Sequence, residues 1–138
     1  MGKIIVEFPH KYIAKGYLGE IWRPYALCEM KVKGRDDVWA PITIIVDTGA
    51  DYTLLPFIYA DVLGIDLVKD CTAEKTFGIG GKETVYLYKG LDIKIANCRK
   101  TVPVGFLKKT DIPPLLGRLG FLETIKVVFH NRATVFEV

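Results

Sequence analysis

The sequence has few of the residues that build metal centres and disulfide frameworks. Its 138 residues include three cysteines, Cys28, Cys71 and Cys98, and two histidines, His10 and His130. The cysteines are odd in number and widely spaced, and no Cys-x-x-Cys pair occurs, which argues against a disulfide framework or a zinc site. We therefore expect buried free thiols in a reducing compartment, with no metal and no cofactor.

Long hydrophobic runs and strong charge are absent too. No apolar run approaches the roughly 20 residues of a membrane-spanning helix, and the first residues lack the basic segment, apolar core and cleavage site of a signal peptide. The net charge is +3, and the lysines are scattered singly or in pairs. Such a mild charge does not indicate a nucleic-acid surface. These absences predict a cytoplasmic protein with neither a membrane nor a nucleic-acid partner.

The length of the chain and its composition set the scale of the fold. At 138 residues and 50% hydrophobic content, the chain is long enough for one domain with one core. We expect a single domain over residues 1–138, in which residues 1–20 form an N-terminal extension of uncertain role. The chain has no room for a second catalytic lobe.

One stretch, residues 42–51, combines a predicted buried strand with an acidic turn. Ile and Val dominate residues 42–46, as is typical of strands that are buried on both faces. Asp47, Thr48 and Gly49 follow directly. A carboxylate at the edge of an apolar interior needs hydrogen-bond donors, and Gly49 allows the backbone to approach closely enough to supply them. Taken alone, the same residues are equally typical of a capping Asp in a strand-to-helix turn.

Two further motifs follow in a fixed order. Residues 78–81 read Gly-Ile-Gly-Gly, and residues 115–118 read Leu-Leu-Gly-Arg, which places Gly117 at 117 − 47 = 70 positions beyond Asp47. With Asp-Thr-Gly-Ala at 47–50, these motifs resemble the retropepsin-like aspartic proteases over roughly residues 21–138. The resemblance implies an all-β fold: a closed acid-protease barrel with one or two short helices and a flap hairpin.

The apolar patterning predicts the individual elements. Short helices are expected in the segment from Leu54 to Leu63, which Gly64 would cap, and over residues 118–123. Residues 9–20 show no regular element, because Pro9, Gly16 and Gly19 interrupt them. Strands are predicted over residues 3–8, 25–33, 38–46, two stretches within 71–87, 91–96, 101–107, 125–129 and 133–138.

The glycine-rich tip Gly78, Ile79, Gly80 and Gly81 is predicted to be a mobile flap. Three of its four residues lack a large side chain, so the backbone is free to bend. A phosphate-binding loop is the competing interpretation. It is disfavoured because no Gly stands at position 83 and no Lys-Ser or Lys-Thr pair follows.

The chemistry of an aspartic protease requires two carboxylates that share one proton. No second Asp in this chain is followed by Thr-Gly or Ser-Gly. The second carboxylate must therefore come from another copy of the chain, related by a twofold axis. The sequence predicts a homodimeric aspartic endopeptidase that hydrolyses peptide bonds with water activated between two Asp47 carboxylates.

The resemblance also assigns roles to neighbouring residues. Thr48 would hydrogen-bond across the two active-site loops, and Gly49, next to Ala50, would present backbone groups to the substrate. Asp51 would pair with Arg118, while Arg23 would reach Asp51 of the partner subunit. The residues expected to line apolar substrate pockets are Leu54, Ile112, Pro113 and Leu115, together with Pro114; for Leu54 a purely structural place in the core is as well supported.

A second interpretation comes from a different functional class. A retropepsin-like fold could serve as a dimerisation or peptide-binding module with little or no hydrolysis, because a strand-rich cleft binds extended chains whether or not it cuts them. The intact Asp-Thr-Gly-Ala favours the enzyme, because a buried pair of like charges would only destabilise a pure binder.

Overall fold

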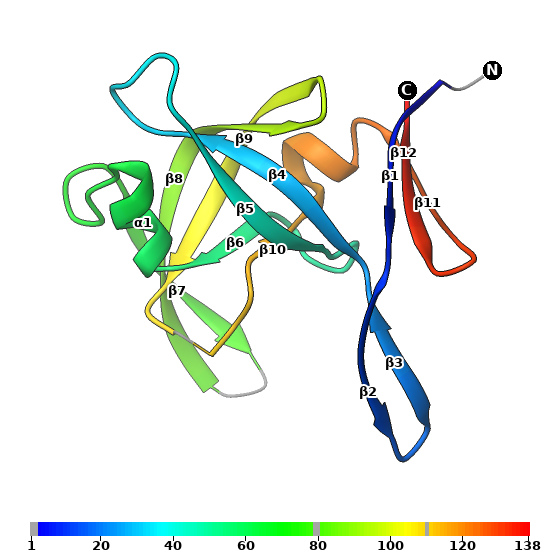
Figure 1. Cartoon of the computed structure of the whole chain (residues 1–138). Coiled ribbons are helices and arrows are strands. Elements are labelled where there is room, and N and C mark those ends of the chain that lie inside the picture. The colour runs from blue at the N-terminus through cyan, green and yellow to red at the C-terminus, as the bar shows by residue number, and fades with distance from the viewer. Residues whose placement is uncertain (1–2, 79–80, 110) are drawn as a thin grey trace.

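The computed structural model describes residues 3–78, 81–109 and 111–138, and it is dominated by β-strands (Figure 1). The elements are β1 (Ile4–Pro9), β2 (Lys11–Gly16), β3 (Gly19–Arg23), β4 (Tyr25–Lys31), β5 (Trp39–Val46), β6 (Thr53–Pro56), α1 (Ile58–Leu63), β7 (Thr72–Gly78), β8 (Gly81–Ile95), β9 (Cys98–Leu107), β10 (Leu115–Leu116), an irregular helical segment Arg118–Leu122, β11 (Lys126–His130) and β12 (Ala133–Glu137). Within these residues no helix is long and apolar enough to cross a membrane.

Six strands close into a barrel. Neighbouring strands pair in the order β4, β5, β10, β6, β9 and β8, and β8 returns to β4 through the pairs Glu29 with Lys94 and Met30 with Ile93. Closure leaves no free edge in the ring itself. β7 extends from β8 as a hairpin arm of the same sheet. The predicted all-β barrel with two short helical segments is confirmed.

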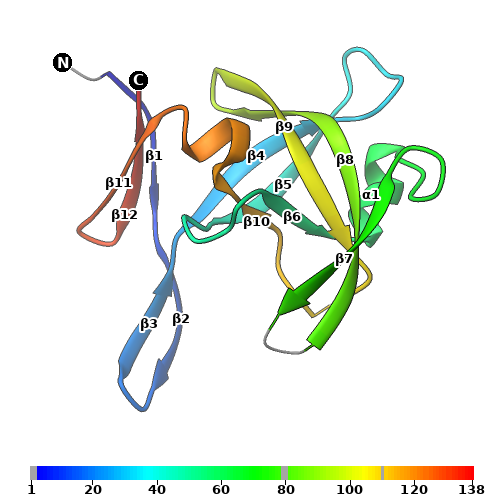
Figure 2. The same ribbon diagram turned by 180° about the vertical axis from the view of Figure 1, so that it is seen from behind.

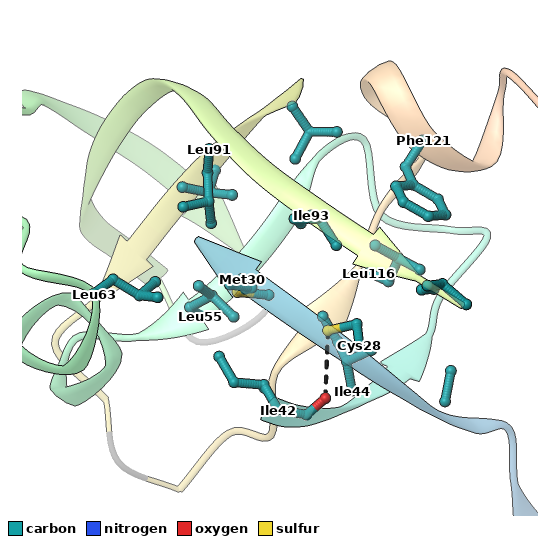
Figure 3. Packing of buried hydrophobic residues seen from close by; sticks show 14 of the residues in the cluster. Cys28, Met30, Ile42, Ile44, Leu55, Leu63, Leu91, Ile93, Leu116 and Phe121 are labelled. Atoms are coloured by element: carbon teal, nitrogen blue, oxygen red, sulfur yellow. Dashed lines mark hydrogen bonds between the residues drawn. The ribbon is translucent and has the colours of Figure 1, made fainter. Parts of the chain in front are cut away.

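The barrel interior is filled by apolar side chains from every strand of the ring (Figure 3). Met30, Ile44, Ile93, Phe106 and Leu116 are fully buried there. In β4, and in β5 from Ile42 to Val46, every second residue is buried. The strand before Asp47 is therefore fully buried on one face, and the expectation that both of its faces are buried was wrong.

The cysteines follow the prediction only in part, because one of the three is buried. Cys28 lies in the core, and its thiol donates a hydrogen bond of 3.3 Å to the carbonyl of Ile42. Burial raises the pKa of this thiol to about 12, so it stays protonated. Cys71 and Cys98 are also free, but they are half-buried.

A second, three-stranded sheet joins the two ends of the chain, in the order β1, β12 and β11. Phe8 of β1 packs edge-on against Phe136 of β12, with ring centroids 6.2 Å apart. Residues from the expected N-terminal extension therefore pair with the C-terminal strand of the same chain. Figure 2 shows this sheet standing beside the barrel.

Three further expectations about individual elements were wrong. Residues 54–56 are strand rather than helix, because Thr53–Pro56 pairs in parallel with Val104–Leu107, and the helix begins only at Ile58. Tertiary pairing overrides the local helical spacing there. Gly64 does end the helix, with the left-handed φ of 69° that favours glycine.

The other two corrections concern strands. Residues 81–95 form one long strand with an irregularity between Tyr88 and Leu91, where separate strands were expected. Residues 11–23 form the hairpin β2–β3 with a tight turn between Gly16 and Gly19, although residues 9–20 were expected to lack regular structure. Glycines were interpreted as breaks, whereas here they form the turn of a hairpin.

Candidate active site

Asp47 follows directly after β5, at one end of the barrel. The two residues before it are held on both sides, because Val46 N–H donates to the carbonyl of Pro24 at 2.8 Å and Ile45 N–H donates to that of Pro114 at 2.9 Å. The N–H of Asp47 itself donates to the carbonyl of Leu116 at 3.0 Å. Buried strand pairing therefore fixes the backbone of this carboxylate.

The turn after Asp47 supplies a donor to its side chain. Gly49 N–H donates to Oδ1 of Asp47 at 3.0 Å, and Ala50 N–H donates to the Asp47 carbonyl at 3.2 Å. The Asp47 side chain is half-buried, whereas Thr48 and Gly49 are exposed. One carboxylate oxygen is thus held by the protein, and the residues around it face open surface.

Arg118 holds the far side of this turn, although it lies 70 residues away in sequence. Its guanidinium donates to the carbonyl of Thr48 at 2.8 Å and to Oδ1 of Asp51 at 2.7 Å. The backbone adds a bond of 3.0 Å from Arg118 N–H to the Ala50 carbonyl. A planar guanidinium suits this two-point grip. The Leu-Leu-Gly-Arg motif at 115–118 therefore fixes the shape of the Asp-Thr-Gly-Ala turn.

Gly117 allows the two motifs to approach this closely. A Cβ atom at this position would overlap the backbone of Tyr52, lying 2.7 Å from its Cα. Gly117 N–H also donates to the hydroxyl of the fully buried Thr53 at 3.1 Å. Glycine is required here for its lack of a side chain rather than for its φ, which is −98°.

Sequence reasoning missed three residues around this turn. Thr53 gives Gly117 its buried acceptor, Glu123 lies 3.6 Å from Nε of Arg118, and Tyr52 provides the backbone against which Gly117 packs. Burial, followed by the nearby charges of Asp51 and Glu74, raises the pKa of the Tyr52 phenol. The sequence contained one signal that could have identified Thr53, because this hydroxyl residue stands directly before a pair of leucines.

Two of the residues predicted to line substrate pockets, Leu54 and Leu115, lie on strands next to the active-site segment. Leu54 of β6 and Leu115 of β10 are opposite each other on adjacent strands. Leu115 directly precedes Leu116, whose carbonyl accepts the N–H of Asp47. Leu54, Ile112, Pro113 and Leu115 are all half-buried, so none is a fully enclosed core residue.

The predicted flap falls partly outside the described residues. Strands β7 and β8 pair from Thr72 with Leu87 to Gly78 with Gly81, so the expected hairpin is present up to these glycines. Ile79 and Gly80, which the flap assignment also includes, lie outside the described residues.

The predicted contact of Arg23 with Asp51 of the partner subunit stays a prediction. Arg23 is exposed at the end of β3, opposite Lys11, and no ion pair involves it within the described part of the chain. The same part of the chain contains no group of three His, Cys, Asp or Glu side chains arranged to hold a metal ion.

Comparison with known protein families gives a match that spans these motifs. Residues 29–118, which are 118 − 29 + 1 = 90 of 138, match the aspartyl protease family. A search of curated proteins found no match. The matched segment begins in β4, contains the Asp47 turn, and ends at Arg118, which holds that turn. The closed β-barrel and the matched segment together show that this chain belongs to the retropepsin-like family of aspartyl proteases.

Proposed function

We propose that the chain is one half of a homodimeric aspartic endopeptidase. The observation that carries this proposal is the Asp47 turn. A carboxylate stands at the end of a buried strand, accepts a hydrogen bond from Gly49, and sits in a turn that Arg118 holds from outside. This rigid support is what a catalytic group needs, because a displacement of about 1 Å can cost two orders of magnitude in rate.

The mechanism needs a second Asp47. With one proton shared between the two carboxylates, the ionised one accepts a proton from water as the water oxygen attacks the peptide carbonyl. The protonated one donates its proton to the carbonyl oxygen. Collapse of the tetrahedral intermediate then returns a proton to the leaving amine and breaks the C–N bond. No metal ion or cofactor takes part in these steps.

The remaining predicted residues have supporting roles in this proposal. Thr48 contacts the partner's turn, and Gly49 and Ala50 offer backbone groups to the substrate. The hairpin β7–β8 closes over an extended peptide whose side chains lie against Leu54, Ile112, Pro113 and Leu115. Arg23 faces Asp51 of the partner subunit.

Peptide cleavage by the purified chain tests the proposal. A peptide library is incubated with the parent protein and with Asp47→Asn, and the products are identified by mass spectrometry. We expect internal cleavage that a pepstatin-type inhibitor suppresses. Asp47→Asn should lower the rate roughly a thousandfold, because the amide has nearly the same shape but cannot act as an acid or a base.

Two controls make this result interpretable. Thermal unfolding and gel filtration should give the same values for parent and variant, since Asp47 is not part of the core. Binding of peptides without cleavage by the parent chain would contradict the enzyme and favour the binding module. Equal rates for both proteins would rule out Asp47 as the catalytic group.

A further inference from the structure

The hairpin β2–β3, which we call the arm (residues 11–23), stands apart from the rest of the molecule. It extends beyond the barrel in the same direction as the hairpin β7–β8 (Figures 1 and 2). All six residues of β2 are exposed, and at the tip Tyr17 is fully exposed and Leu18 is 98% exposed. An isolated two-stranded hairpin is marginally stable in water. An arm with an exposed apolar tip therefore needs a further protein surface against which it can pack.

One face of the arm is already covered within the chain. Trp22 packs edge-on against Tyr12 at 5.2 Å, and the guanidinium of Arg132 lies 4.4 Å from the Trp22 ring. Arg132 also pairs with Glu20 at 3.4 Å. These contacts hold the base of the arm in a fixed direction. They also bury the indole nitrogen of Trp22, which finds no acceptor among the described residues.

The opposite face of the arm is open. Strand register places Ala14 and Ile21 on the face away from Trp22, and Ile21 is an exposed apolar side chain, as is Ile13 at the irregularity in β2. With the tip residues Tyr17 and Leu18, these exposed side chains make up what we call the apolar edge of the arm. Large apolar side chains gathered in this way mark an interaction surface rather than ordinary scattered exposure.

The root of the arm lies beside the catalytic carboxylate. Arg23 ends β3, and the carbonyl of the next residue, Pro24, accepts the N–H of Val46, which directly precedes Asp47. On its other side, the arm is anchored by the N–H of His10, which donates to the carbonyl of Arg132 at 2.7 Å. The arm therefore starts between the active-site turn and the terminal sheet.

This position identifies the occupant as a second copy of the chain. Each chain supplies one Asp47, so a working site brings a second Asp47 into contact with the first. The five residues of β3 span roughly 16 Å at about 3.3 Å each, so the arm extends about that far from its root beside the Asp47 segment. The arm also carries Lys11, Lys15 and Arg23 against the single acid Glu20, whereas the turn at 47–51 carries two acids.

We propose that the arm is a dimer clamp: its apolar edge packs on the body of the second chain, and by twofold symmetry the second arm packs on the first. This proposal rests on the homodimer of the proposed function and adds the element that holds it together. The clamp sets the fraction of chains that are dimeric, and therefore carry a complete active site, at a given protein concentration. It does not alter the chemistry at Asp47.

The first test compares dimer dissociation constants by sedimentation equilibrium. The double variant Tyr17→Ser, Leu18→Ser removes the apolar tip without touching the core. A matched control, Val62→Ser with Val68→Ser, removes two exposed apolar side chains on the α1 side of the barrel. We expect the tip variant to raise Kd by about tenfold or more and the control to leave it unchanged. At saturating concentration the tip variant should cleave at the parent rate per dimer.

The second test detects the contact directly. The benzophenone amino acid p-benzoyl-phenylalanine replaces Leu18 in one sample and Val68 in another, and both purified proteins are irradiated above the Kd. Position 18 should give a covalent species of twice the chain mass, and position 68 should not. A dimer that forms without a cross-link from position 18, and with an unchanged Kd for the tip variant, would overturn the clamp.

The outcomes separate the clamp from the catalytic proposal. A dimer that cleaves peptides but ignores the tip variant refutes the clamp alone. A dimer that depends on the tip but cleaves nothing supports the clamp and refutes the peptidase. A parent chain that stays monomeric at every concentration refutes both.

Discussion

The barrel and the arm show two different ways in which one chain handles apolar side chains. In the barrel, six strands close on themselves and enclose Met30, Ile44, Ile93 and Phe106 completely. In the arm, the two strands form a separate two-stranded sheet, and Tyr17 in the turn between them is left in water. The barrel buries its own apolar side chains, whereas the exposed apolar side chains of the arm can be buried only against another molecule. The active-site turn lies where the two regions meet.

The sharpest way to test this comparison is to add one methyl group to each region. Gly117→Ala places a Cβ against the Tyr52 backbone, which cannot move without breaking the Thr53 contact. We expect the free energy of unfolding to fall by about 3 kcal/mol, as in other overpacked interiors. Urea denaturation, followed by far-ultraviolet circular dichroism, measures it.

The matched change in the arm should be nearly silent. In Gly16→Ala the new Cβ meets its nearest atom, Cδ1 of Ile21, at 3.4 Å, an ordinary contact. We expect a change of less than about 0.5 kcal/mol, which is typical of surface positions. Equal losses from the two variants would show that the barrel and the arm are not packed differently.

A smaller effect is expected where the barrel supports the active-site turn. Arg118→Lys keeps the charge but cannot hold both the Thr48 carbonyl and Asp51, because an ammonium lacks the planar fork of a guanidinium. The turn should then orient Asp47 less well, and kcat/KM should fall about tenfold.

The control for this variant is Arg99→Lys, which alters an ion pair of 2.5 Å with Asp92 on the barrel surface. Steady-state kinetics at saturating dimer concentration should leave its kcat/KM at the parent value. An unaltered kcat/KM for Arg118→Lys would mean that the turn holds its shape without the guanidinium.

The smallest expected effect concerns the response of the barrel to acid. Hydrogen bonds from the Thr101 hydroxyl and then from Arg99 hold the pKa of Asp92 below its usual value. The folded state therefore gains stability above the unfolded pKa of about 3.9 and loses it as the pH falls through the lower folded pKa. Asp92→Asn should cost well under 1 kcal/mol at pH 7, because water screens this pair.

Thermal unfolding at several pH values checks this sign. The difference between Asp92→Asn and the parent should shrink as the pH falls from about 4 through the lower folded pKa, because Asp92 then becomes protonated and, like Asn, uncharged. A difference of the same size at pH 7 and at pH 2.5 would contradict the assignment. The arm variant Gly16→Ala serves as the control, since its effect involves no titrating group.

The sequence was most informative where function and local chemistry coincide. Asp-Thr-Gly-Ala and Leu-Leu-Gly-Arg indicated the family and the barrel, because both motifs need particular residues for close backbone approach. The spacing of 70 residues could not show that Arg118 grips the Thr48 carbonyl, since that contact depends on the whole intervening barrel. Thr53 was missed for the same reason, as its partner Gly117 lies 64 positions away.

Errors arose where tertiary pairing outweighs local pattern. Residues 54–56 have helical spacing but pair with β9, and the long strand β8 continues past the glycine at position 90. The arm was missed because Gly16 and Gly19 were interpreted as interruptions, although a Gly-flanked turn is also a hairpin signal. Only the tertiary structure shows that this hairpin has no third strand beside it within the described residues.

The central claim, that two chains each contribute one Asp47 to a single site, is tested most directly by mixing. Parent chains and Asp47→Asn chains are combined in equal amounts, allowed to exchange subunits, and assayed at a total concentration well above the Kd. If both carboxylates are needed, only dimers of two parent chains cleave, and random pairing makes them about a quarter of the total. The account predicts about one quarter of the activity of the same total concentration of parent protein; a value of one half would show that each chain works alone and would contradict it.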